Sequence, residues 1–254
     1  MSGAHTDGEA YDRAVGRWSR ILGQEFVPWL GVRRDASWLD VGCGTGALTA
    51  AILDLAWPGR VTGVDTSQAF LEQARRNLPG ADLRLGDAMA LPSSAGAFDV
   101  TVSGLMLSHV SDPAGAAAEM VRVTRPGGTV GVYVWDADRY VTRHYWEAAA
   151  AAGAPRLDED PRRRFPIASG RAVADLMRNT GLREVQTRAL EAWVRFETFD
   201  EYWQGLLGRQ GHTGSHLASL PAGLQDAVRR ELEQRLGPGP FEIAARAWAA
   251  RGRR

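Results

Sequence analysis

Short apolar runs alternate with stretches of helical periodicity between residues 36 and 136 of the chain. Five runs have the length and the apolar, β-branched content of buried strands, and they cover residues 37–42, 60–65, 82–87, 98–104 and 129–135. The segments between them space their apolar residues as helices do, at 45–56, 67–77 and about 114–123. "RPGG" at 125–128 predicts a helix stop and a turn. This alternation is typical of a parallel sheet with helices on both faces.

The pattern changes on both sides of this core. Residues 11–30 have helical spacing, the alternation stops after Trp135, and it resumes with a helix at 169–179 and a strand at 182–196. Residues 208–216, "GRQGHTGSH", predict a glycine-rich interruption of a second helical stretch, and a last strand is expected near 240–250. The predicted segments are an N-terminal helical part of a lid (1–35), a ligand-binding core (36–136), a first lid insertion (137–168), a continuation of the core (169–196), a second lid insertion (197–236) and a final core strand and tail (237–254).

The charge balance argues against a highly charged partner. All 30 basic residues are arginines, and they equal the 30 acidic residues, so the composition favours neither nucleic acid nor membrane. The absence of lysine excludes a Schiff base and a P-loop lysine. The single Cys43 fits a reducing compartment, and the pattern contains neither a signal peptide nor an apolar run of about 20 residues. We expect a cytoplasmic monomer or homodimer whose partner is a small molecule.

Glycines at 42, 44 and 46 follow the first strand and precede a helix. Glycines there let backbone N–H groups approach a ligand at a helix N-terminus. Asp65 ends the next strand about 20 residues later, which is the usual place for a carboxylate that binds a ribose diol. These features fit a nicotinamide dinucleotide and S-adenosylmethionine equally well.

Three features favour the cationic ligand over the dinucleotide. Asp40, two residues before the first glycine, would repel a pyrophosphate but suits an ammonium and a sulfonium. The G-x-G-x-G spacing differs from the dinucleotide fingerprint G-x-G-x-x-G. Asp87 ends the third strand, where it can accept a hydrogen bond from an exocyclic amine. With Asp65, these aspartates would form an acidic rim along the carboxyl ends of the strands.

Five stretches in order resemble the class I S-adenosylmethionine-dependent methyltransferases, in particular the branch that contains the quinone-biosynthesis C-methyltransferases. They are "LDVGCGTG", "VTGVDTSQAFLEQAR", "LRLGDAMALP", "FDVTVSGLMLSHV" and "RVTRPGGTVGVYVWD". The resemblance is dense over residues 36–136 and absent over 137–168 and 197–236. It implies an α/β fold: a doubly wound, seven-stranded, mainly parallel sheet of the Rossmann-like kind with helical lid insertions and an antiparallel last strand. It also implies S-adenosylmethionine as cofactor and S-adenosylhomocysteine as product.

The same resemblance assigns residues to the methionine part of the cofactor. Gly42 and Gly44 would line it, Asp40 would lie near its amino group, and the backbone of Ser103 would contact it. In the N-terminal helix, Tyr11 and Arg17 are expected over the carboxylate, since arginine binds carboxylates in a bidentate manner.

The adenosine part is assigned to residues after the second and third strands. Asp65 would bind the ribose hydroxyls, and Thr66 would pack on the adenine. Asp87 would bind the adenine amine, and the backbone of Ala88 would bind a ring nitrogen.

The acceptor side is less defined. His109 follows the fourth strand on the loop that borders the transferred methyl in this fold, and it is the candidate general base; packing of a loop is the alternative. The candidate residues of an apolar acceptor pocket are Tyr140, His144, Tyr145, Trp146 and Trp203, for which packing of the lid is the alternative. His212 and His216 have the i, i+4 spacing of helical zinc ligands but lie in a glycine-rich stretch, so we expect a loop and no metal.

These features predict transfer of a methyl group to a C or O atom of a small, fairly apolar molecule such as a quinone, phenol, lipid or natural product. Two alternatives stay open: a non-catalytic protein that binds S-adenosylmethionine or acts as a scaffold, and a nicotinamide-dependent oxidoreductase. Methylation of a macromolecule would require a basic groove, for which the balanced charge gives little support.

Overall fold

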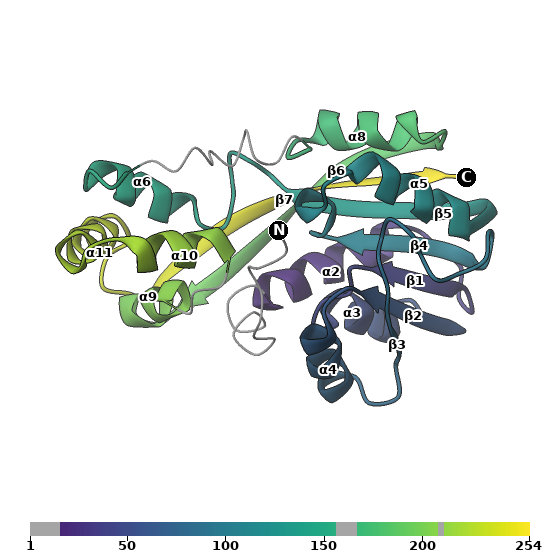
Figure 1. The fold of residues 1–254 in the computed structure, drawn as a ribbon, viewed down its shortest axis with the longest axis horizontal. Coiled ribbons are helices and arrows are strands. Elements are labelled where there is room, and N and C mark those ends of the chain that lie inside the picture. Colours follow the sequence, from purple (N-terminus) through teal and green to yellow (C-terminus); the bar gives the residue numbers. More distant parts are fainter. Residues whose placement is uncertain (1–15, 156–166, 208–210) are drawn as a thin grey trace.

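The structure is a computed structural model that describes residues 16–155, 167–207 and 211–254. Within them, seven strands form one sheet in the order β3-β2-β1-β4-β5-β7-β6 (Figure 1). The strands are β1 Ser37–Val41, β2 Arg60–Asp65, β3 Asp82–Leu85, β4 Phe98–Gly104, β5 Thr124–Trp135, β6 Arg183–Phe196 and β7 Phe241–Arg253. The first five pair in parallel, and β7 is antiparallel to both of its neighbours. The predicted sheet, with its antiparallel last strand, is therefore confirmed.

Helices cover both faces because successive side chains of a strand point to opposite sides. Trp38 lies in the core beneath α2 and α3, whereas its neighbour Leu39 lies in the core beneath α5 and α8. The helices that flank the sheet are α2 (Arg17–Trp29), α3 (Ala47–Leu55), α4 (Gln68–Asn77), α5 (Pro113–Val123) and α8 (Gly170–Asn179). Figure 1 shows α5 and α8 on one side and α2 and α3 on the other.

The order of the strands reverses between β1 and β4. From β1 the chain continues outward through β2 to the edge strand β3, and it then returns to place β4 on the other side of β1. In an open α/β sheet, the crevice at such a reversal, outside the carboxyl ends of the strands, is where ligands bind. The glycine loop after β1 and the loop with His109 after β4 both lie at this reversal.

Among the described residues, four further helices form a helical cap beyond the carboxyl ends of β4 and β5, around the far end of the antiparallel β6–β7 pair (Figure 1). They are α6 (Arg143–Ala151), α9 (Phe199–Leu207), α10 (Gly211–Ser219) and α11 (Ala222–Leu236). Both segments that were expected to be insertions contribute helices to this cap. Its buried side chains, such as Tyr145 and Leu217, belong to the same hydrophobic cluster as Trp38 under the sheet.

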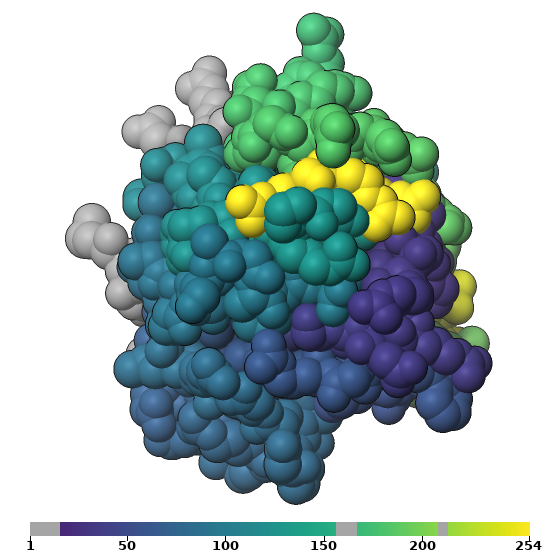
Figure 2. Space-filling model, turned by 90° about the vertical axis from the view of Figure 1, so that its right-hand side faces the viewer, coloured from purple at the N-terminus to yellow at the C-terminus, as the bar shows by residue number. Residues whose placement is uncertain are grey.

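Two local predictions are corrected. The helix stop predicted at "RPGG" (125–128) is confirmed, because α5 ends at Val123, but these residues are the beginning of β5 and not a turn. The C-terminal residue explains this, because Arg254 donates its N–H to the Gly128 carbonyl (3.1 Å) and accepts a hydrogen bond from the Gly127 N–H (2.9 Å). Gly127 has a φ of +74°, which glycine adopts without steric cost. Figure 2 shows the C-terminal end of β7 in yellow, enclosed by neighbouring segments at this end of the sheet.

The glycine-rich stretch 208–216 is also not a loop throughout, since α10 begins at Gly211. Thr213, His216 and Leu217 are buried on this helix. Their packing in the cap outweighs the low helix propensity of the glycines, as tertiary contacts commonly do.

Candidate functional site

The glycine loop joins β1 to α3 and is held against the end of β2. The N–H groups of Gly42 and Cys43 both donate to the Val64 carbonyl, at 2.8 Å and 3.0 Å. Gly42 has a φ of +70°, and a Cβ built there would lie 2.3 Å from Cγ of Met106. Gly42 is therefore required by the close packing of the two loops.

Gly44 differs from Gly42 in what surrounds it. Its φ is +56°, but a Cβ built there would meet nothing within 4 Å in the described part of the chain. The fold thus leaves open space beside Gly44, where a ligand can approach the backbone.

Asp65 holds the tip of this loop. One carboxylate oxygen accepts the N–H of Gly44 (2.9 Å), and the other accepts the N–H of Ser67 (2.8 Å). Ser67 in turn caps α4, with its side chain accepting from the N–H of Phe70 (3.3 Å). The half-buried carboxylate therefore fixes the end of β2 to the glycine loop, and Thr66 beside it is exposed. Each carboxylate oxygen can accept more than one hydrogen bond, so these contacts are compatible with the predicted ribose contact.

Asp40 lies at the carboxyl end of β1, as expected, but it is buried there. It is 0% exposed beneath the loop, because its side chain points toward α3. The hydroxyl of Thr49 donates to its Oδ2 (2.7 Å), while Oδ1 has no hydrogen-bond partner among the described residues. Burial, with a smaller contribution from the nearby Asp65 charge, raises the pKa of Asp40 from 3.8 to about 7. A buried carboxylate with one oxygen unpaired is stabilised in its ionised form by a cation placed nearby.

The remaining cofactor candidates lie at the same edge of the sheet. Asp87 is exposed, and its carboxylate accepts the N–H of Met89 (2.9 Å) in the turn after β3, while Ala88 is buried. Ser103 is fully buried near the end of β4, and its hydroxyl has no partner. The structure thus brings the ends of β1 to β4 together as predicted, and the individual cofactor contacts stay predictions.

Of the two N-terminal candidates, Tyr11 lies outside the described residues. Arg17 begins α2, and its guanidinium pairs with Glu201 of α9 at 3.0 Å. It also lies over the ring of Phe196, 5.0 Å from the ring centre. In this structure Arg17 therefore connects α2 to the helical cap, and its contact with the cofactor stays a prediction.

His109 ends a short 3-10 helix, η2 (Leu107–His109), and its side chain is exposed. Its backbone N–H donates to the Met106 carbonyl (2.8 Å), which closes the loop after β4. This loop lies against the glycine loop through Met106. The placement fits the predicted base, whose proton-transfer role stays a prediction.

The five aromatic and histidine candidates of the acceptor pocket differ in their burial and contacts, and their role in binding an acceptor stays a prediction. Tyr140 packs edge-on against Trp135 at the end of β5, with ring centres 5.8 Å apart. His144 is half-buried, and burial lowers its pKa. Tyr145 and Trp203 are buried in the core of the cap, so packing accounts for their side chains, and Trp146 stacks on the ring of a histidine (5.0 Å).

That histidine is His216, and it is a structural residue. Its Nε2–H donates to the Pro155 carbonyl (3.1 Å), so Nδ1 accepts the hydroxyl hydrogen of Tyr145 (2.7 Å). Among the residues that the structure describes, no group of three or more His, Cys, Asp or Glu is arranged to hold a metal ion.

Two contacts escape sequence analysis. Thr49 of α3 donates to Asp40 of β1, although a threonine at that position is typical of an ordinary helix residue. Arg143 donates to the Ala244 carbonyl, which neither its spacing nor its neighbours predict.

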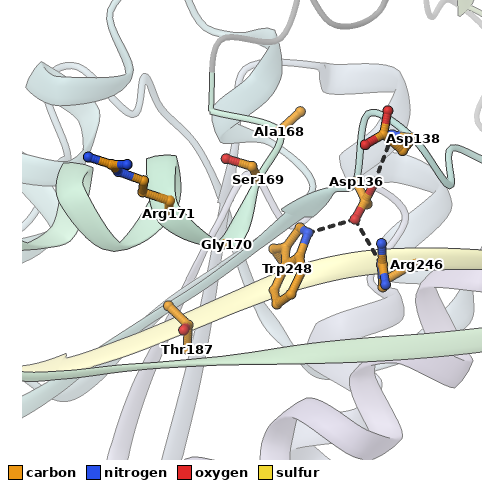
Figure 3. Close-up of a pocket in the computed structure, with 9 residues that line it drawn as sticks. All are labelled: Asp136, Asp138, Ala168, Ser169, Gly170, Arg171, Thr187, Arg246 and Trp248. Atoms are coloured by element: carbon orange, nitrogen blue, oxygen red, sulfur yellow. Dashed lines mark hydrogen bonds and ion pairs between the residues drawn. The ribbon is translucent and has the colours of Figure 1, made fainter.

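A separate polar cavity of about 430 Å³ lies beside the end of β5, on the α8 side (Figure 3). Asp136 organises its wall: Oδ2 accepts from Trp248 Nε1 (2.6 Å) and Arg246 Nε (2.8 Å), and Oδ1 accepts from the Asp138 N–H (2.7 Å). The residues that line the cavity are Asp136, Asp138, Ala168, Ser169, Gly170, Arg171, Thr187, Arg246 and Trp248. None of them is a predicted site residue, so this cavity is distinct from the glycine-loop site.

In sequence, the chain is similar to proteins that are named methyltransferases. Residues 39–132 match the family described as "Methyltransferase domain". The chain is 34% identical over 185 residues to the 2-methyl-6-phytyl-1,4-hydroquinone methyltransferase of Synechocystis sp., covering 68% of this chain and 55% of that protein. It is 41% identical over 105 residues to a demethylmenaquinone methyltransferase of Staphylococcus aureus, covering 40% of this chain and 44% of that protein.

Among solved structures, the fold is similar to phosphoethanolamine N-methyltransferase 2 of Haemonchus contortus in complex with S-adenosyl-L-methionine. The TM-score is 0.57 at 15% identity, covering 97% of this chain and 56% of the other. The chain spans only 33% to 55% of the length of the first curated relatives that it matches. Within the described residues, none of the helices is both long and apolar enough to cross a membrane.

Proposed function

We propose, from the premise that this chain contains a class I S-adenosylmethionine-dependent methyltransferase domain, that it methylates a C or O atom of a small, fairly apolar acceptor. The observation that carries the proposal is the glycine loop. Asp65 fixes it, the space beside Gly44 is open, and a carboxylate oxygen of Asp40 lies beneath it without a partner. A nicotinamide dinucleotide would bring a pyrophosphate toward Asp40 and Asp65, whereas a sulfonium with an ammonium group brings positive charge.

The residues present fit the cofactor on physical grounds. The open side of Gly44 accommodates a ligand against the backbone, and the buried charge of Asp40 acts strongly because its surroundings have a low dielectric constant. The exposed carboxylate of Asp87 lies at the next loop of the same edge, where it can accept hydrogen bonds from an amine. When bound, S-adenosylmethionine supplies an electrophilic methyl group.

The chain's own part in the reaction is to orient the acceptor, exclude water and accept a proton where the acceptor has one to lose. The cap stands over the carboxyl ends of β4 and β5, so an acceptor held there is removed from bulk water (Figure 1). His109 is exposed on the loop after β4, where its imidazole can accept a proton from a hydroxyl or an activated carbon. Alignment of donor and acceptor supplies most of the rate enhancement in transfers of this kind.

For the acceptor we propose a quinol or another phenol. The support is similarity, since two relatives are named for a phytylhydroquinone and for demethylmenaquinone. The half-buried aromatic side chains of Tyr140 and Trp146, in and beside the cap, also suit a flat, apolar ring. We further propose a cytoplasmic monomer or homodimer without a nucleic-acid partner, in keeping with its balanced charge.

The test is calorimetric titration of the protein with S-adenosylmethionine, S-adenosylhomocysteine and NADH, followed by a methyl-transfer screen of phenols and quinols. We expect micromolar binding of the first two, no binding of NADH, and transfer to at least one phenolic acceptor. Binding of NADH alone would point to an oxidoreductase. Binding of S-adenosylmethionine without transfer to any acceptor in a broad panel would point to a binding or scaffold protein.

A further inference from the structure

The hydroxyl of Tyr202 is buried in the cap without a partner. Tyr202, in the middle of α9, is 5% exposed, and its oxygen has no hydrogen-bond partner among the residues that the structure describes. Its ring packs edge-on against Phe196 and Phe241, with centres 5.1 Å and 6.0 Å apart. Burial raises the pKa of this phenol, so Tyr202 stays a neutral donor at physiological pH. Buried hydroxyls in proteins are normally hydrogen-bonded, so this unused donor points to a ligand.

Arg143 provides a positive charge that, within the described residues, acts electrostatically on Glu147 one turn later but forms no ion pair. It begins α6, is half-buried, and donates through Nη1 to the Ala244 carbonyl. In the described part of the chain, no carboxylate lies within ion-pair distance of it, whereas its neighbour Arg139 is paired with Glu191 (2.8 Å). Burial lowers the pKa of Arg143, but an arginine stays charged in proteins. Donors of the guanidinium other than Nη1 are therefore available to a ligand.

The two groups lie in one region of the cap although they come from the two different insertions. Both contact β7: Arg143 donates to the Ala244 carbonyl, and the ring of Tyr202 packs against Phe241, three residues earlier on the same strand. Each also influences the pKa of the other electrostatically. The contact with Ala244 places the pair along the sheet, because Ala247, three residues later, pairs with Trp135 at the end of β5. At about 3.3 Å per residue, Ala244 lies about 10 Å beyond the carboxyl end of β5.

From these contacts we infer that the acceptor carries an anionic oxygen, a carboxylate or a phenolate, and that Arg143 and Tyr202 bind it. The inference rests on the proposed function, since it concerns the acceptor of that reaction. A charged guanidinium and a neutral hydroxyl are both donors, and together they complement an oxyanion and disfavour an amine cation. The acceptor is thus an acidic aromatic molecule whose anionic end lies in the cap and whose other end faces the cofactor edge.

The test uses two matched probe pairs with the full chain, in a calorimeter, with saturating S-adenosylhomocysteine. 1-Naphthoate is compared with 1-naphthamide, and 4-nitrophenolate with 4-nitroanisole. We expect the protein to bind at least one anion about tenfold or more tightly than its neutral partner, as a charge-assisted hydrogen bond implies. Tyr202→Phe and Arg143→Gln should each reduce this preference. The matched control is Arg139→Gln, which removes a paired arginine before the same helix and should keep the preference.

The variants also separate binding from folding. Tyr202→Phe removes an unpartnered hydroxyl, so its melting temperature should equal or exceed that of the wild type even if Arg143→Gln is destabilised. Equal affinity for both members of each pair, or a preference that Tyr202→Phe leaves unchanged, would overturn the inference. The proposed function is judged by a different signal, the heat of S-adenosylhomocysteine binding, so it can stand when the acidic-acceptor inference fails.

Discussion

Replacement of Asp40 by asparagine tests the buried carboxylate beneath the glycine loop. In the unfolded chain the carboxyl group has a pKa near 3.8, and in the folded protein burial raises the pKa to about 7. Since the folded state then binds the proton more tightly, the free energy of unfolding falls as the pH rises between these two values. The difference between the two pKa values corresponds to about 4 kcal/mol at 1.36 kcal/mol per pH unit.

Asparagine keeps the shape of the side chain and an oxygen that can accept the Thr49 hydroxyl, but it does not titrate. The stability of Asp40→Asn relative to the wild type should therefore increase by about 3.4 kcal/mol between pH 4 and pH 7, since Asp40 is still half protonated at the upper end of this window. Urea unfolding at each pH, with linear extrapolation, measures this difference. Asp54→Asn, at an exposed position on α3, is the control and should stay within about 0.5 kcal/mol of the wild type throughout.

Cofactor binding adds a second readout of the same group. A positive charge near Asp40 favours its ionised form, so S-adenosylmethionine should release up to one proton on binding at pH 6. Calorimetry in two buffers with different heats of ionisation reports that release, and Asp40→Asn should abolish it. A pH-independent stability difference between Asp40→Asn and the wild type would refute the reasoning from burial. Proton release that persists in the variant would place the linked group elsewhere.

Four further substitutions probe the site by calorimetry with S-adenosylhomocysteine and by urea unfolding. Gly44→Ala should cost about 1–2 kcal/mol of stability through its positive φ and should weaken binding at least tenfold, because the methyl group enters open space; unchanged affinity would count against the site. Gly42→Ala should cost a further 1–3 kcal/mol, roughly, because its Cβ meets Met106, and equal stability of the two variants would contradict this packing. Asp65→Ala should weaken binding by about 1–3 kcal/mol, since it releases the Gly44 N–H as well as the ribose contact. His109→Ala should leave affinity unchanged and slow methyl transfer, and full activity would reduce it to a loop residue.

Sequence analysis predicted best the strands that lie inside the sheet, with a paired strand on each side. β2 and β4 begin and end where the apolar runs predicted, because central strands of a parallel sheet are apolar along their whole length. Sequence analysis failed where strand pairing depends on a distant segment. The pattern of 125–128 predicts a turn, but hydrogen bonds of Gly127 and Gly128 with Arg254 make these residues part of β5. It failed again at α10, where burial of His216 and Leu217 against other helices decides the conformation.

At the candidate site, the spacing of glycines and aspartates predicted which loops meet but not what each atom does. The chain order of Asp40 and Asp65 cannot show that one is sealed beneath the loop while the other fixes its tip. Nor can periodicity distinguish Tyr145, whose hydroxyl is satisfied by His216, from Tyr202, whose hydroxyl is not. These distinctions depend on which side chains from distant elements face each other.

The shared core of cap and sheet limits how this protein can be re-engineered. The outer half of the β6–β7 pair contributes Leu190, Val194 and Ile243 to the same apolar cluster as the cap helices. A chimera that replaced only 137–168 and 197–236 with the helices of a relative would leave these strand ends facing mismatched side chains, and cavities or overpacking would then lower its stability. A graft that is meant to exchange acceptor preference should therefore carry the outer ends of β6 and β7 together with the cap helices, as one interchangeable module.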